Sequence, residues 1–168
     1  MSNDHRDSLL QASRRVDWRF LLPSPTLGQV GYVGHDQEML ASLRAFATSV
    51  AATDLASSAA GAVKGACDVV VLTTPSVSTL QGARSLLREG GHLYMEVDRR
   101  LAVGAVRSPG ECQRLLLRAR FEDIRLYCPW TAFETSTAFV PLAHPGAMAY
   151  FLSRHEQGLT ARARATAG

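Results

Sequence analysis

The sequence LLREGGHLYMEV, residues 86–97, decides the fold expected of this 168-residue chain. Its first residues complete an apolar helical pattern, Gly90 and Gly91 favour the end of that helix, and residues 92–97 favour a strand. The preceding CDVVVL, residues 67–72, is almost continuously apolar and β-branched, which is typical of a strand buried on both faces. Together these segments predict a strand, a crossover helix and a second strand parallel to the first.

The same alternation continues on both sides of this unit. Further strand patterns fall at residues 29–33, 48–53, 124–127 and 137–142. Helical patterns fall at residues 36–47, 75–90, from 108 onward and at 145–155. Asp36 suits the N-cap of the first helix, and Ser108 with Glu111 forms the capping-box pattern of the third. About ten residues join the last two strands, which is too few for a parallel crossover, so we expect these strands to be antiparallel.

The composition is that of an ordinary globular protein, with 46% apolar and 20% charged residues. A net charge of +3 without a concentrated basic run predicts no nucleic-acid partner. The cysteines Cys67, Cys112 and Cys128 are too widely spaced for a metal site, and their odd number favours a reducing compartment. No apolar run approaches the ~20 residues of a membrane span, so we expect a cytoplasmic protein without a membrane partner.

The expected organisation is one domain with two appendages. Residues 1–23 are predicted to be an N-terminal arm or latch, in which the apolar segment around Trp18 either covers a cleft or mediates assembly. The proline-rich turn after this arm leads into a single α/β domain over residues 24–158. Residues 159–168 are predicted to form a flexible tail.

Three segments resemble the class I S-adenosylmethionine-dependent methyltransferases: residues 68–75, residues 86–97, and RARFEDI at 118–124, which is similar to the family's A-G-F-x-x-V/I turn. The resemblance spans roughly residues 28–142. It implies a doubly wound, Rossmann-like sheet of mostly parallel strands with one antiparallel strand near its C-terminal end. Only thirteen residues separate Asp54 from Asp68, so the family's third strand is expected to be missing.

The resemblance implies a cofactor site after the first strand, where the family has an acidic residue followed by Gly-x-Gly-x-Gly. The acidic position falls on Tyr32, the first glycine is Gly34, and the other two glycines fall on Asp36 and Glu38. Bulky, negatively charged side chains at these positions hinder the close backbone approach that glycines permit. The S-adenosylmethionine loop is therefore expected to be degraded.

Other candidate residues lie at the same expected edge. Asp54 matches the family's ribose-binding acidic residue, although a helix cap is an equally good interpretation. Thr73 and Thr74 follow the central strand, where ligands of open α/β sheets bind. His35 is a candidate general base, because histidine is the residue type that most often has this role, although an exposed loop histidine is the plainer interpretation. The candidate cofactor-binding residues are Tyr32, Gly34, His35, Asp54, Thr73 and Thr74; no metal site is expected.

Three functions remain open. The first is a pseudoenzyme with a degraded S-adenosylmethionine site, a non-catalytic or repurposed component of a bacterial biosynthetic pathway. Its exposed sheet edge is then expected to be covered by a second copy or by a partner protein. The second is an active methyltransferase with an unusual cofactor loop, acting on a small molecule. The third is a cofactor-independent enzyme that uses His35, Asp36 and Glu38 as acid–base groups. The altered loop and the shortened chain favour the first.

Overall fold

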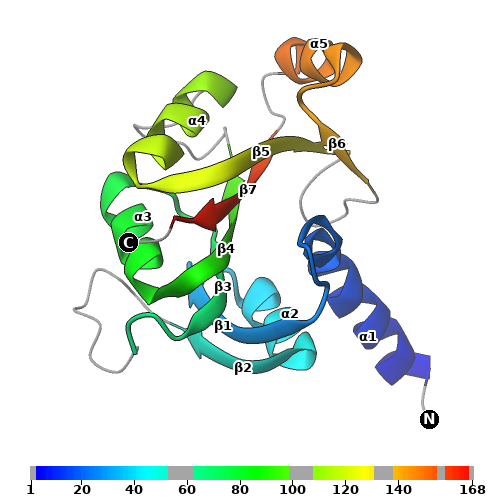
Figure 1. The fold of residues 1–168 in the computed structure, drawn as a ribbon. Helices are drawn as coiled ribbons and strands as arrows, with labels where there is room; N and C mark the ends of the chain where they lie inside the picture. The colour runs from blue at the N-terminus through cyan, green and yellow to red at the C-terminus, as the bar shows by residue number, and fades with distance from the viewer. Residues whose placement is uncertain (1–2, 53–62, 99–107, 131–137, 155–157, 167–168) are drawn as a thin grey trace.

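The computed structural model describes residues 3–52, 63–98, 108–130, 138–154 and 158–166 (Figure 1). The strands of its seven-stranded sheet are β1 (Leu27–Val33), β2 (Ala47–Ala52), β3 (Cys67–Leu72), β4 (Leu87–Val97), β5 (Phe121–Pro129), β6 (Phe139–Pro141) and β7 (Leu159–Ala165). The helices are α1 (Asn3–Arg15), the 3-10 helix η1 (Asp17–Leu21), α2 (Gln37–Phe46), α3 (Val77–Leu86), α4 (Pro109–Arg118) and α5 (Pro145–Ser153). None of the described helices is long and apolar enough to cross a membrane.

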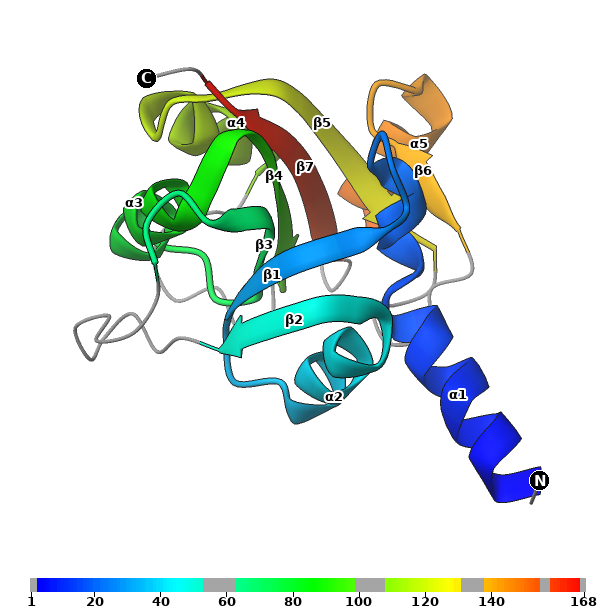
Figure 2. The same ribbon diagram turned by 60° about the horizontal axis from the view of Figure 1, so that its bottom comes forward.

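The strand order is β2-β1-β3-β4-β7-β5-β6, with helices on both faces (Figure 2). The strands β2, β1, β3 and β4 are mutually parallel, which confirms the doubly wound α/β fold. The predicted antiparallel pairing of the last two strand patterns is also confirmed, because β6 runs against β5. The sequence predicts one antiparallel strand, but the described sheet has two, because β7 as well as β6 is antiparallel to its neighbours. The connection expected to lack a strand includes residues 53–62, which lie outside the described ranges.

The flexible tail expected over residues 159–168 is wrong for residues 159–165, which form β7. This strand lies between β4 and β5 and is hydrogen-bonded to both. Its alanines, Ala161, Ala163 and Ala165, belong to the core on one face of the sheet. On the opposite face Arg162 and Arg164 form ion pairs with β5 carboxylates. Small apolar residues alternating with paired arginines therefore make a buried strand from a sequence that contains few large apolar side chains.

The glycine pair that was expected to end α3 lies inside β4 instead. The helix ends at Leu86 and the strand begins at the next residue. Gly90 adopts a φ of +70°, and the register between β3 and β4 shifts across this stretch. A Cβ atom on Gly91 would lie 2.9 Å from the Arg88 carbonyl oxygen. The pair therefore permits an irregularity within the strand, because both a left-handed residue and a close backbone approach are needed there.

Helix caps are formed where the sequence predicts them. The Asp36 side chain accepts hydrogen bonds from two backbone amides at the start of α2. At α4, Ser108 and Glu111 form the expected capping box. Ser76 forms a second capping box at α3, with Thr79 as its partner. These caps satisfy amides that have no partner within the helix, which places each helix start independently of tertiary contacts.

Each face of the sheet carries its own hydrophobic core. One core joins the sheet to α3, α4 and α5, and the other joins it to η1 and α2. In the second core Trp18 is 1% exposed and stacks on Tyr94, with ring centroids 4.1 Å apart and an interplanar angle of 8°. The segment around Trp18 therefore packs against the sheet.

Arg120 offers a test of the turn between α4 and β5. It has a φ of 60° at the position where the resembling family's A-G-F pattern has glycine. A left-handed non-glycine residue costs roughly 1–2 kcal/mol, and the Arg120 side chain is exposed. We expect Arg120→Gly to raise the free energy of unfolding by about 0.5–1 kcal/mol in urea, since glycine removes most of that strain. The control Arg114→Gly, at an exposed position inside α4, should lower it by a similar amount. Destabilisation by both substitutions would show that Arg120 is not strained.

Candidate functional site

The carboxyl ends of β1 and β3 meet at one edge of the sheet, where the predicted site residues gather. The Thr73 amide donates a hydrogen bond to the Val33 carbonyl oxygen at 3.1 Å, which brings the two strand ends together. A Cβ atom on Gly34 would lie 1.9 Å from Thr73 Oγ1 and 2.8 Å from the Tyr32 hydroxyl. Glycine is therefore required at position 34 because neighbouring side chains fill the space beside it.

The Tyr32 side chain fills the inside of the β1–α2 loop. It is 1% exposed, and its hydroxyl donates to the Asp36 carbonyl oxygen at 3.0 Å while accepting from the Asp36 amide at 2.8 Å. Burial raises the pKa of the Tyr32 phenol, although hydrogen bonds from its neighbours oppose this effect. In this structure Tyr32 stabilises the loop and presents no exposed ring face to a ligand.

Asp36 closes the start of α2. One carboxylate oxygen accepts hydrogen bonds from the amides of Glu38 and Met39, at 2.9 and 3.0 Å. The other oxygen binds the Arg15 guanidinium at 2.8 Å. Burial opposes ionisation of this carboxyl group, but the Met39 amide and Arg15 outweigh burial and hold the pKa of Asp36 below its ordinary value. The positive end of the α2 dipole is therefore already occupied by a carboxylate of the same chain.

Arg15 extends this arrangement to β4. Its guanidinium forms two hydrogen bonds with the Glu96 carboxylate, at 2.7 and 2.8 Å, and it is only 3% exposed. The Tyr94 hydroxyl also donates to Glu96, at 3.0 Å. Burial alone would lower the pKa of Arg15, but its bonds to Glu96 and Asp36 raise that pKa above its already high ordinary value. We call Arg15, Asp36 and Glu96 the edge ion cluster.

The pairing of Arg15 with Glu96 is not predictable from the sequence. Arg15 lies among other polar residues near the N-terminus, and Glu96 lies within the strand pattern at residues 92–97, so neither carries a local signal for the other. The pair is separated by 81 residues. Only the docking of α1 brings the guanidinium to the end of β4.

The remaining predicted residues are less closely joined to this cluster. His35 and Thr74 are exposed, and the Thr74 carbonyl oxygen accepts from the Thr79 hydroxyl at the start of α3. Asp54 lies outside the described residues. Glu38, a candidate acid–base group, accepts a hydrogen bond from the Gln11 side chain at 2.9 Å. Among the described residues, no group of three or more His, Cys, Asp or Glu side chains is placed to hold a metal ion.

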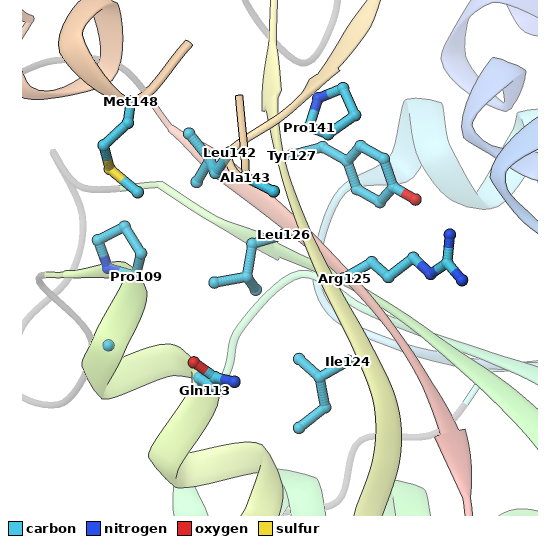
Figure 3. A pocket seen from close by; sticks show the side chains of 11 residues that line it. Pro109, Gln113, Ile124, Arg125, Leu126, Tyr127, Pro141, Leu142, Ala143 and Met148 are labelled. Atoms are coloured by element: carbon cyan, nitrogen blue, oxygen red, sulfur yellow. The ribbon is translucent and has the colours of Figure 1, made fainter. Parts of the chain in front are cut away.

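A hollow of about 590 Å³ lies elsewhere in the molecule, between α4, β5 and the segment that joins β6 to α5 (Figure 3). Most of the residues around it are apolar, and they come from segments that are distant in sequence. No single stretch of the chain carries a signal for it, so the sequence analysis did not predict it.

Comparisons with known proteins identify the fold. No family model and no curated protein matches the chain. Among solved structures, a SAM-dependent methyltransferase from Thermotoga maritima, described as a possible histamine N-methyltransferase, is 16% identical with a TM-score of 0.55, over 95% of this chain and 90% of that one. A SAM-dependent methyltransferase from Archaeoglobus fulgidus is 9% identical with a TM-score of 0.57, over 92% and 94%.

A third similar structure is the complex between the Haloferax volcanii Trm112 methyltransferase activator and a putative methyltransferase. Its identity is 13% and its TM-score 0.54, over 97% of this chain and 92% of that one. At such identities the likeness concerns the fold. This chain has a class I SAM methyltransferase-like fold, as the sequence resemblance implied.

The edge ion cluster predicts that alanine substitution lowers the free energy of unfolding far more at Arg15 than at its neighbour Arg14. Arg15→Ala leaves the buried Glu96 carboxylate without its cation, so we expect a loss of about 3–5 kcal/mol in the free energy of unfolding. Arg14→Ala, on the exposed side of α1, should cost less than about 0.5 kcal/mol. Urea denaturation followed by circular dichroism measures both values.

A double variant separates charge from packing in the same measurement. Arg15→Ala with Glu96→Gln removes the unpaired charge as well, so it should be more stable than Arg15→Ala alone. If Arg15→Ala costs no more than Arg14→Ala, the cluster does not stabilise this edge.

Proposed function

We propose that this chain is a methyltransferase-fold protein whose S-adenosylmethionine site is degraded, and that it serves as a non-catalytic or repurposed component of a bacterial biosynthetic pathway. One observation carries the proposal. The groups that could hold a ligand at the start of α2 are bound within the chain: the Asp36 carboxylate accepts from the Glu38 and Met39 amides, and the Arg15 guanidinium binds that carboxylate.

These contacts compete directly with a cofactor. A ligand that used the α2 amides would have to displace Asp36, which is tethered beside them and loses little freedom by binding. A ligand that approached Gly34 closely would meet the Tyr32 hydroxyl and Thr73 Oγ1. The described residues of this edge therefore fit S-adenosylmethionine poorly, and we derive no methyl-transfer step from them.

An active S-adenosylmethionine-dependent methyltransferase acting on a small molecule is the second candidate. The fold similarity favours it, because it extends over more than nine-tenths of this chain for the Thermotoga maritima and Archaeoglobus fulgidus structures. In this case the exposed residues His35 and Thr74 would contact the cofactor, together with Asp54. Tyr32, Gly34 and Thr73 would support the loop from beneath.

A second copy of the chain or a partner protein is proposed to cover the sheet edge at β2. Among the described strands, β2 pairs with β1 alone and lies at the end of the strand order. Its sequence, ATSVAA, contains no charged residue and no proline, the features by which natural edge strands usually avoid pairing. The Haloferax volcanii complex supports the partner form of this proposal, since a protein of similar fold there is in complex with an activator protein.

Calorimetric titration with S-adenosylmethionine and S-adenosylhomocysteine tests the choice between the two functions. We expect no heat of binding from the wild-type protein at millimolar ligand, because the loop groups already have partners. Micromolar binding that is lost in Asp54→Ala would instead establish the active methyltransferase. A cooperative thermal transition of each sample controls for folding.

Sedimentation velocity across a concentration series tests the β2 edge. We expect a concentration-dependent dimer that Ser49→Lys abolishes, since a lysine on the exposed part of an edge strand opposes pairing. Ser78→Lys on α3 adds the same charge at an exposed site away from β2 and should leave the dimer unchanged. If the wild-type protein stays monomeric at all concentrations, a second copy of the chain does not cover the β2 edge, and only the partner-protein form of the proposal is retained.

A further inference from the structure

The hollow beside α4 arises from the alternation of side chains along β5. Ile124 and Leu126 point toward α4, whereas Arg125 and Tyr127 point to the opposite side of the strand (Figure 3). The start of α4 contributes one wall, where Gly110 has no side chain and a Cβ atom built on it would meet nothing within 4 Å. The opposite wall contains Leu142 and Ala143 from the segment between β6 and α5, and Met148 from α5.

The size and lining of this hollow are those of a small-molecule site. Its volume of about 590 Å³ lies within the range of roughly 300–1,000 Å³ that is usual for ligand pockets. Ile124, Leu126 and Met148 are only partly buried, so apolar surface remains in contact with water. A ligand that covered this surface would remove apolar area from water, which favours binding.

The charges around the hollow restrict the ligand further. Arg125 is the charged residue among the described lining residues, and its guanidinium binds Asp123 at 3.3 Å on the other side of β5. A charged ligand would therefore lose hydration without gaining a counter-ion, which is costly. Gln113 contributes an amide that can both donate and accept a hydrogen bond. A neutral molecule with one hydroxyl or carbonyl group complements this lining.

We propose that the hollow between α4, β5 and α5 binds a neutral, predominantly apolar small molecule whose single polar group pairs with Gln113. The site belongs to the sheet face covered by α3, α4 and α5, whereas the edge ion cluster and Trp18 belong to the other face. Binding of a small molecule in this hollow therefore does not require that S-adenosylmethionine binds at the other site. The proposal stands or falls separately from the function proposed above.

A matched pair of fluorescent probes tests the proposal on the full chain. N-phenyl-1-naphthylamine is neutral and apolar, and 8-anilinonaphthalene-1-sulfonate is the same ring system with one sulfonate added. We expect saturable binding of one neutral probe per chain, at least about tenfold tighter than that of the sulfonate. No saturable signal up to the solubility limit, or equal affinity for the two probes, would overturn the proposal.

Variants locate the binding. Gly110→Leu places a side chain into open space at the α4 wall and should weaken the neutral probe about tenfold or more. Arg118→Leu adds the same side chain at an exposed position of α4 outside the hollow and should change nothing. If thermal melting shows that Gly110→Leu does not fold, Ala143→Leu fills the hollow from the opposite wall. Unchanged affinity in a folded filling variant would exclude this site.

Discussion

The arrangement of the N-terminal segment depends on one buried guanidinium group. Glu96 lies at the end of a central strand, where an unpaired carboxylate would be strongly destabilising. Arg15 supplies the cation, and its second contact, to Asp36, joins the same helix to the start of α2. Three residues later Trp18 stacks on Tyr94, whose hydroxyl binds Glu96. The ion pair with Glu96 and the stacking on Tyr94 therefore both hold the segment from Arg15 to Trp18 against the sheet.

This arrangement also explains how the β1–α2 loop keeps its shape with only one of the three glycines of the resembling family. Glycine-rich loops leave backbone amides free for a ligand, and their conformation permits close approach. Here the Tyr32 hydroxyl binds both backbone groups of Asp36, and the Asp36 carboxylate binds two amides of α2. These side-chain hydrogen bonds within the chain hold the loop in its conformation.

The features predictable from the sequence are those with local causes. Asp36 and Ser108 cap helices through amides only two or three residues away, and the central apolar strand is evident from its own composition. β7 was not predicted, because its burial depends on its pairing with β4 and β5. Its alternation of alanine with arginine contains too few large apolar side chains to indicate a buried strand by itself. Arg15 was missed for the same reason. Both the hollow and the edge ion cluster are made by residues that meet only in the folded chain.

The position of β7 sets an order for folding. In the native sheet β7 lies between β4 and β5. Until residues 159–165 have been synthesised, β5 therefore lacks its native partner on the side that faces β4, and the native sheet cannot extend from β4 to β5. The pairing of β7 with β4 joins residues 62 to 72 positions apart, and such non-local contacts form slowly. The part of the sheet that contains β1, β3 and β4 can form first. During that time the edge of β5 that later pairs with β7 has backbone groups without their native partners.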